Sequence, residues 1–198
     1  PAKLNIILYI LMVERIMKTL DGEPVLFHPS CFYLDGYKAR WIQLKDLPRE
    51  TLAFSTAVSW KAMRMEVCIA SNVSSATEPY SITLENPCGN KEYLKSHLQK
   101  SVRRSNVYRT VKTAYHHIDA NLQDFLRRLS IIAVEDALPL DGFSTLVWLM
   151  AANSKGYQLS QEQLHWCLGY AADLARCKFM ELRKHEKDSQ PDIKSMRL

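Results

Sequence analysis

From residue 90 onward, apolar side chains recur at helical spacing, and polar capping residues interrupt this pattern at intervals. The interruptions predict a helix over 90–104, a second over 106–118 that Ser105 caps, and a third that Asn121 opens. A further helix over 143–153 is apolar on nearly every side, as expected for a helix at the centre of a core. Such a chain must bury several helical faces against one another, so it predicts a helical bundle.

The last long helix is predicted to begin at a capping box, because Gln163 follows Ser160 at the spacing in which each residue caps the other. Its apolar stripe extends to Leu182, and the polar residues beyond it are expected to fray. The sequence therefore predicts a bundle over 90–187 and a frayed tail over 188–198.

Residues 1–70 indicate a mixed part that packs on the bundle. Two aromatic-rich segments flank Asp35-Gly36, a dipeptide typical of turns in which both residues take positive φ, so we expect a hairpin near 31–42. The apolar run over 4–20 predicts a buried helix, and a proline at a first turn favours another helix over 48–67.

Residues 71–89 are rich in Ser, Thr, Asn, Pro and Gly and lack a helical period, so we expect a linker or long loop there. The expected fold class is mainly α: a helical bundle with a small α+β N-terminal part that contains the hairpin. The apolar opening over 4–13, which Glu14 and Arg15 end, is shorter than the roughly 20 residues that cross a bilayer, so no membrane partner is expected.

The chain has five cysteines, an odd number at irregular spacing without a Cys-x-x-Cys pair. This pattern argues against a disulfide framework and a structural zinc site, and it favours reduced thiols in an intracellular compartment such as the cytoplasm, nucleoid or nucleus. Glycine-rich phosphate-binding motifs are missing, so no cofactor is expected. His116 and His117 would point about 100° apart on a helix, which disfavours a shared metal ion.

The positive charge is concentrated in the second half of the chain. Residues 1–90 hold nine basic and nine acidic side chains, so the whole net charge of +5 lies in 91–198. Within 91–112, seven Lys and Arg residues are accompanied by Glu92 alone. Two successive basic helices suit a phosphate backbone, although a solvated helical hairpin is the alternative. The candidate nucleic-acid-binding residues are Lys95, Lys100, Arg103, Arg104, Arg109 and Lys112.

Aromatic and acidic residues leave further options open. Tyr108 and Tyr115 are candidates for stacking on bases, although tyrosines at helical spacing more often pack against their neighbours. Arg127-Arg128 and Glu135-Asp136 lie two turns apart on one predicted helix, which favours a structural role in orienting neighbouring helices. Candidate anchors for a protein partner are Trp41, Trp60 and Trp166, each of which is more often a core residue.

Three motifs follow one another over residues 94–141. They are Leu98-Gln99-Lys100-Ser101-Val102-Arg103-Arg104-Ser105-Asn106, then Arg127-Arg128-Leu129, then Ala133-Val134-Glu135-Asp136-Ala137-Leu138. This order resembles the helical C-terminal region of clamp-loader-like AAA+ ATPases, in the branch of the Werner-helicase-interacting and bacterial replication-recombination proteins. The resemblance covers about a quarter of the chain and implies a collar-like bundle used for self-association. The ATPase of that family lies upstream of its collar, and this chain has no Walker motif.

The charge pattern and the resemblance together predict a non-catalytic, nucleic-acid-associated module, such as an accessory subunit in DNA or RNA replication, repair or processing. An alternative is a protein–protein scaffold or oligomerisation subunit of a larger complex. A third hypothesis is a metal-dependent nuclease that uses Asp119, Glu135 or Asp136. Because no motif gathers these carboxylates, no catalytic residue is assigned, and an enzyme is the less favoured class.

Overall fold

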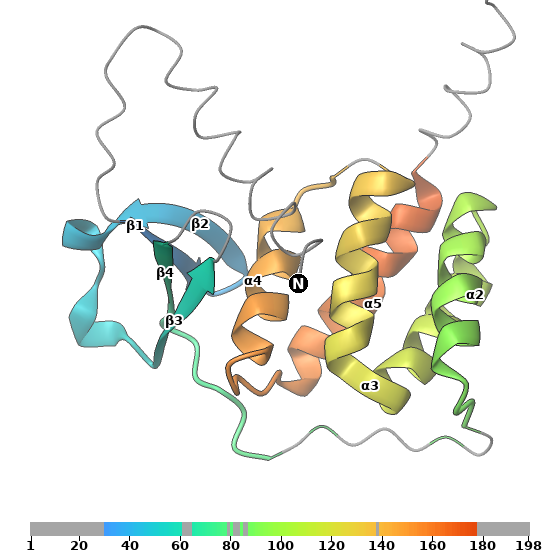
Figure 1. Cartoon of the computed structure of the whole chain (residues 1–198), viewed down its shortest axis with the longest axis horizontal. Coiled ribbons are helices and arrows are strands. Elements are labelled where there is room, and N and C mark those ends of the chain that lie inside the picture. The colour runs from blue at the N-terminus through green and yellow to red at the C-terminus, as the bar shows by residue number, and fades with distance from the viewer. Residues whose placement is uncertain are drawn as a thin grey trace, which may run out of the picture.

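A computed structural model shows a small sheet beside a row of helices (Figure 1). It describes residues 30–60, 65–78, 80, 84, 87–137 and 139–177. Within these residues there are four strands and four helices, so the architecture is α+β rather than strictly mainly α. The helix expected over 4–20 and the tail expected to fray over 188–198 lie outside the described residues.

The sheet is mixed, with strand order β2-β1-β4-β3. Strand β1 (Ser30–Asp35) pairs antiparallel with β2 (Lys38–Gln43) and parallel with β4 (Met65–Ser71). Strand β3 (Phe54–Trp60) pairs antiparallel with β4 and forms the edge opposite β2. The two central strands are therefore neighbours in the sheet although β2 and β3 separate them in the sequence.

The hairpin predicted near 31–42 is confirmed, but its turn differs from the expectation. Asp35 pairs with Lys38, which leaves Gly36 and Tyr37 as the two residues of the turn. Gly36 has a φ of 58°, whereas Asp35 and Tyr37 do not take positive φ. The glycine alone supplies the left-handed conformation, and the aspartate takes the last position of the strand.

The helix predicted over 48–67 is wrong. Pro48 precedes a single 3-10 turn over Arg49–Thr51, and the chain then enters β3 and β4. Along β3 the half-buried or buried residues Phe54, Thr56 and Val58 alternate with exposed small residues, which is the two-residue period of a strand. Proline at a first turn is compatible with a helix, but this alternation decides the structure.

The first two helices form a hairpin of their own. Helix α2 (Lys91–Arg103) begins at the N-cap Asn90, and helix α3 (Val107–Glu135) begins at Asn106, whose side chain accepts a hydrogen bond from the Arg109 amide. Asn106 therefore caps α3 in place of the predicted Ser105, which instead takes a φ of 51° in the connecting turn. These two adjacent residues reverse the chain between α2 and the first half of α3, where His97 meets Thr113.

Helix α3 contains the break that was predicted at Asn121. This residue has a φ of −173° and a ψ of 100°, so its backbone is extended within the helix. Its side chain accepts a hydrogen bond from the amide of Asp124 at 2.8 Å and thereby caps the second half of the helix. The break is therefore a second helix start rather than a random bend.

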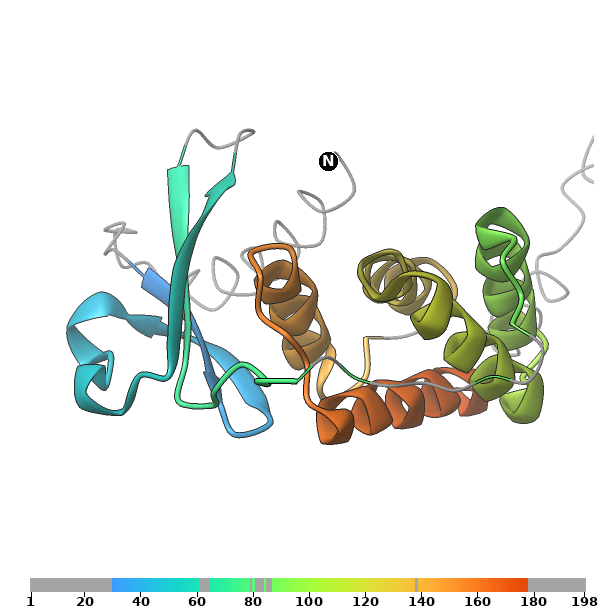
Figure 2. The same cartoon turned by 90° about the horizontal axis from the view of Figure 1, so that it is seen from below.

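Helix α4 (Phe143–Asn153) has the predicted bounds and lies between the sheet and the other helices (Figure 2). The buried indole of Trp148 donates a hydrogen bond to the Phe32 carbonyl at 3.0 Å. Thr145 accepts from the Ala39 amide at 3.1 Å and donates to the Tyr37 carbonyl at 2.8 Å. A continuous buried cluster joins the sheet to the helices through these contacts.

Helix α5 (Gln161–Arg176) starts with the predicted capping box between Ser160 and Gln163. The Gln163 amide also donates to the Tyr157 hydroxyl at 3.0 Å, which links the start of α5 to the aromatic cluster around Trp148. Among the described residues, no helix is both long and apolar enough to span a membrane.

Candidate nucleic-acid interface

The helical hairpin of α2 and α3 carries all six basic residues that the sequence singled out. It lies at the end of the molecule away from the sheet (Figure 1). The six residues divide into two groups: four have exposed side chains that form no ion pair among the described residues, and two are held by carboxylates. This difference separates the cations that pair with carboxylates from those that have no carboxylate partner in the described residues.

The four exposed cations gather around the turn between the two helices. Lys100 lies on the last turn of α2 and Arg104 is its C-cap, whereas Arg109 and Lys112 lie on the first two turns of α3. All four are exposed. Because the first half of α3 packs back along α2, the end of α2 and the start of α3 bring these four cations together on one positive surface.

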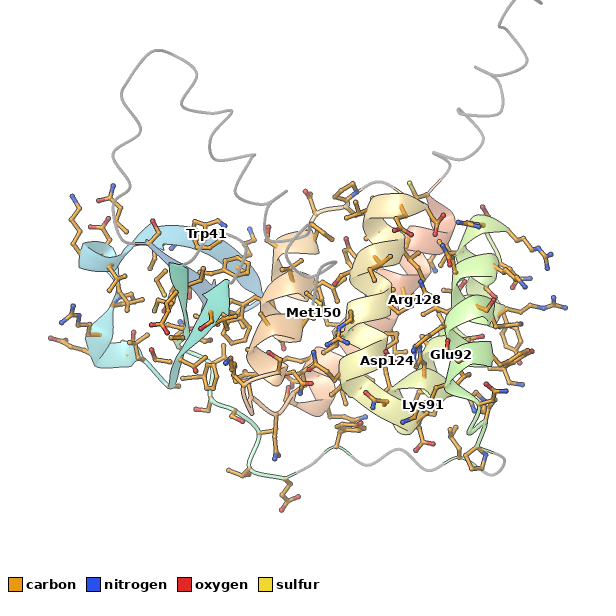
Figure 3. All side chains as sticks on the ribbon, viewed as in Figure 1. Trp41, Lys91, Glu92, Asp124, Arg128 and Met150 are labelled. Atoms are coloured by element: carbon orange, nitrogen blue, oxygen red, sulfur yellow. The ribbon has the colours of Figure 1, made fainter. Side chains whose placement is uncertain are left out.

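Lys95 is held by two carboxylates. Its ammonium lies 2.9 Å from Glu92 and 3.1 Å from Asp124, and only 23% of its side chain is exposed. Hydrogen bonds from Lys95 to Glu92 and then Asp124 raise the pKa of the lysine above its ordinary value. Figure 3 shows Glu92 and Asp124 near each other on the facing sides of α2 and α3. The geometry gives Lys95 a helix-pairing role.

Arg103 is engaged with Asp136, which is 4% exposed and caps the end of α3. The Arg103 Nε atom donates to Asp136 Oδ1 at 2.6 Å, and the Gln99 amide donates to Asp136 Oδ2 at 2.6 Å. Asp136 thus orients α2 on α3, the kind of role expected for the Glu135-Asp136 segment. Reversing the charge of Arg103 would set two negative charges together, so this residue is unsuited to a clean binding test.

A buried histidine adjoins the Lys95 pair. His117 Nε2 lies 3.1 Å from Asp124 Oδ2, and the imidazole is fully buried against Phe125. Burial lowers the pKa of His117, and the hydrogen bond to Asp124 only partly offsets that effect. The neutral ring therefore donates from Nε2 to Asp124, while Nδ1 has no hydrogen-bond partner among the described residues. Sequence reasoning missed Asp124, because its partners lie seven or more residues away.

The carboxyl of Asp124 is shaped by the same neighbours. Burial raises its pKa, but the hydrogen bonds from His117 and Lys95 outweigh burial, so the pKa lies below its ordinary value. The residue is a charged acceptor that connects α2, the segment before the Asn121 break and the segment after it. It fixes the angle between the two halves of α3.

Two exposed tyrosines accompany the cations. Tyr108 is 74% exposed on the first turn of α3, and Tyr93 is 55% exposed and stacks on His97 at a ring distance of 5.3 Å. On a helical period, Tyr93 shares a face with Lys100 and Arg104, and Tyr108 shares a face with Lys112. Tyr108 is therefore available for stacking, whereas Tyr115 is half-buried. The sequence reading had overlooked Tyr93.

The other candidates are not gathered into a site. Asp119 is exposed and lies before the Asn121 break, whereas Glu135 and Asp136 lie at the far end of the segment after it. Among the described residues, no three His, Cys, Asp or Glu side chains are placed to hold a metal ion. Trp41 stacks on Phe32 and Trp166 stacks on Tyr170, so both are packed. The side chain of Trp60 is outside the described set.

Comparison of the chain with protein-family models, with curated proteins and with solved structures finds no match. The resemblance to the collar of the replication-associated ATPases therefore stays a prediction. The geometry of the α2–α3 hairpin is the basis for a functional proposal.

Proposed function

We propose that the protein is a non-catalytic module that binds the phosphate backbone of DNA or RNA through the turn between α2 and α3. The observation that carries this proposal is the contrast within one hairpin: Lys95 and Arg103 are paired, while four neighbouring cations are exposed without a carboxylate partner in the described residues. Unpaired cations on one continuous surface favour a polyanion, because neutralising phosphates releases condensed counterions.

The exposed tyrosines favour a strand with accessible bases. Tyr108 is 74% exposed and adjoins the cations Arg109 and Lys112. An aromatic ring beside a positive track stacks on bases of any sequence, and the cations hold the backbone. The interaction is expected to be strong at low salt and weakly dependent on sequence.

The resemblance supports a role as an accessory subunit in replication, repair or processing, within an assembly that includes protein partners or further copies of this chain. A reducing intracellular compartment suits this role, because the five cysteines are present as free thiols. This part of the proposal depends on the motifs over 94–141 rather than on the surface of the hairpin.

The test is fluorescence anisotropy with labelled single- and double-stranded DNA and RNA at two salt concentrations. The triple variant Arg104→Glu, Arg109→Glu and Lys112→Glu is expected to bind at least about tenfold more weakly, with a salt slope shallower by about three. Arg109→Glu and Lys112→Glu place negative charge on the first two turns of α3, which the helix dipole favours, and Arg104 is exposed at the C-cap of α2 without an ion pair in the described residues, so this variant is expected to fold. Arg103 is left unchanged because of its bond to Asp136.

A matched control carries the same charge change elsewhere. Lys45, Arg49 and Lys155 are exposed, and Lys45→Glu, Arg49→Glu and Lys155→Glu together are expected to lower affinity only through net charge. Equal loss in both variants, or no binding by the wild type at low salt, would refute the proposal. Concentration-dependent mass in light scattering without nucleic-acid binding would favour the scaffold, and strand cleavage that needs Mg²⁺ would favour the nuclease.

A further inference from the structure

The sheet contains a pair of thiols that belongs to no feature of the proposed interface. Cys31 on β1 and Cys68 on β4 are register partners in the parallel pairing of these two strands. Their Sγ atoms are 2.9 Å apart, and both residues carry free thiols. The two side chains come from positions 37 residues apart in the sequence and meet because the sheet places β1 beside β4.

The pair lies on the face of the sheet that is turned away from α4. Phe32 and Leu34 belong to the core shared with the helices, whereas Cys31 belongs to a smaller apolar cluster with Tyr33 and Ala70. The segment between β2 and β3 covers this face through Leu47 and Leu52. Cys31 is fully buried there, and Cys68 is half-buried. Cys68 is therefore the more accessible of the two thiols.

Backbone geometry allows a bond between the two sulfur atoms. Neighbouring strands lie about 4.8 Å apart, and disulfides join Cα atoms that are about 4.4–6.8 Å apart, so register partners on adjacent strands fall in the permitted range. The side chains already converge, and the remaining closure is that of two side-chain rotations. The sheet does not need to rearrange.

We propose that Cys31 and Cys68 form a disulfide site, which joins the two central strands when the protein meets a small disulfide oxidant such as oxidised glutathione. The Cys68 thiol loses its proton, and its sulfur attacks one sulfur of the oxidant. The oxidant's S–S bond breaks, and the first glutathione leaves and takes up that proton. Cys31 then attacks the Cys68 sulfur, forms the strand-to-strand bond and expels the second glutathione, which takes the Cys31 proton. The protein loses two hydrogens, and the oxidant is reduced to two thiols.

The environment sets the order of these steps. Burial, and then the hydrogen bond with Cys68, raise the pKa of Cys31 far above its ordinary value, so this thiol is a poor initial nucleophile. Cys68 is the accessible partner and reacts first, and Cys31 resolves the mixed disulfide because it lies next to it. In a reducing compartment the pair stays a dithiol, and it becomes a disulfide only when the protein meets an oxidant.

The experiment compares protein treated with oxidised glutathione with protein kept in a thiol reductant. After oxidation, free thiols are alkylated in denaturant, and peptides are mapped by mass spectrometry without reduction. We expect a peptide that joins Cys31 to Cys68, a loss of two alkylated thiols, and a melting temperature about 10 °C above that of the reduced protein, as expected for a closed loop of this length. Reductant is expected to reverse all three changes.

Matched cysteine variants show whether the oxidation-dependent changes come from Cys31 and Cys68. Cys68→Ala and Cys31→Ser are each expected to abolish the joined peptide and the oxidation-dependent shift in melting temperature. Cys88→Ala and Cys177→Ala remove half-buried thiols outside the sheet and are expected to keep both. Full alkylation of Cys31 and Cys68 after oxidation of the wild type, or a stable glutathione adduct at Cys68 alone, would overturn the proposal. Because these readouts use the wild type, they do not depend on the folding of a variant.

Discussion

The sheet end and the helical-hairpin end of the molecule are held together by different forces. At the sheet end, α4 presents apolar residues on every side, and the polar groups of Trp148 and Thr145 bond to backbone atoms of the strands. At the other end, α2 buries only one side, and the charged residues Asp124 and Asp136 fasten it to α3.

This contrast explains why the proposed binding surface lies on the hairpin rather than on α4. A helix that is buried all round has no side chain left for a ligand, whereas a helix with one buried face displays whatever the other face carries. Within the hairpin, Asp124 and Asp136 pair with Lys95 and Arg103 and with none of the other four cations. Four exposed cations have no carboxylate partner in the described residues, which leaves them available to phosphate in the proposed interface. They are Lys100, Arg104, Arg109 and Lys112.

The largest expected effect is at the sheet end. Trp148→Ala removes a fully buried indole and its bond to the Phe32 carbonyl, so the free energy of unfolding is expected to fall by about 3–5 kcal/mol. Urea denaturation followed by circular dichroism measures the loss. The control Tyr108→Ala removes an exposed ring and is expected to change stability by less than about 0.5 kcal/mol. A loss below about 1 kcal/mol for Trp148→Ala would contradict the central role of α4.

A smaller effect is expected at the charged end. Asp136→Ala removes the acceptor of both Arg103 and Gln99, and these freed side chains remain in reach of water. The free energy of unfolding is expected to fall by about 1.5–3 kcal/mol, as for other hydrogen bonds to charged groups. Asp173→Ala, which breaks the exposed pair with Arg176, is the control and is expected to cost under about 0.5 kcal/mol. Equal losses in the two variants would show that Asp136 does not fasten the helices.

The smallest effect is a difference in acid sensitivity. The pKa of His117 is lower in the folded protein than its ordinary value of 6.5. As the pH drops through 6.5, the unfolded chain therefore takes up a proton that the folded protein does not, and the free energy of unfolding falls. Asp124, whose folded pKa is also lowered, adds a loss below its ordinary value of 3.8. Between about pH 7 and pH 5, the free energy of unfolding of His117→Gln is expected to fall less than that of the wild type, by a difference of about 1 kcal/mol or less.

The measurement for this prediction is urea denaturation at several pH values. His165→Gln, at an exposed position on α5, serves as the control and is expected to keep the wild-type profile. Because α4 and the strands meet through apolar and backbone contacts, the drop from about pH 7 to pH 5 is expected to weaken the packing of α2 on α3 before it affects the sheet. An unchanged slope in His117→Gln would contradict the assignment of a neutral, buried imidazole.

Local signals in the sequence were sufficient for the parts of the fold that depend on neighbours along the chain. The hairpin around Gly36, the helix over Phe143–Asn153 and the capping box at Ser160 all follow from residues within a few positions of one another. The strands β3 and β4 were missed because proline before a polar residue is compatible with a helix start. Only the alternation along β3 distinguishes the two structures.

The site was harder to predict, because residues far away in the sequence decide which of its basic side chains form ion pairs. All six basic residues were visible in the sequence, but the pairing of Arg103 with Asp136, 33 residues away, was not. The pairing of Lys95 with Asp124 was not visible either. The register that brings Cys31 beside Cys68 likewise depends on a parallel pairing that no local pattern encodes.

The bond between the Trp148 indole and the Phe32 carbonyl joins residues 116 positions apart and has a consequence for the order of folding. During synthesis, β1 to β4 leave the ribosome well before α4. Until α4 follows, the face of the sheet that packs on α4 has no partner and stays exposed to solvent. The hydrogen bonds of Asp136 that hold α2 on α3 join residues 33 and 37 positions apart, so this hairpin can close before α4 docks on the sheet. When α4 emerges, it docks between two partners made earlier, and the period before that event is when the nascent chain is most prone to aggregate.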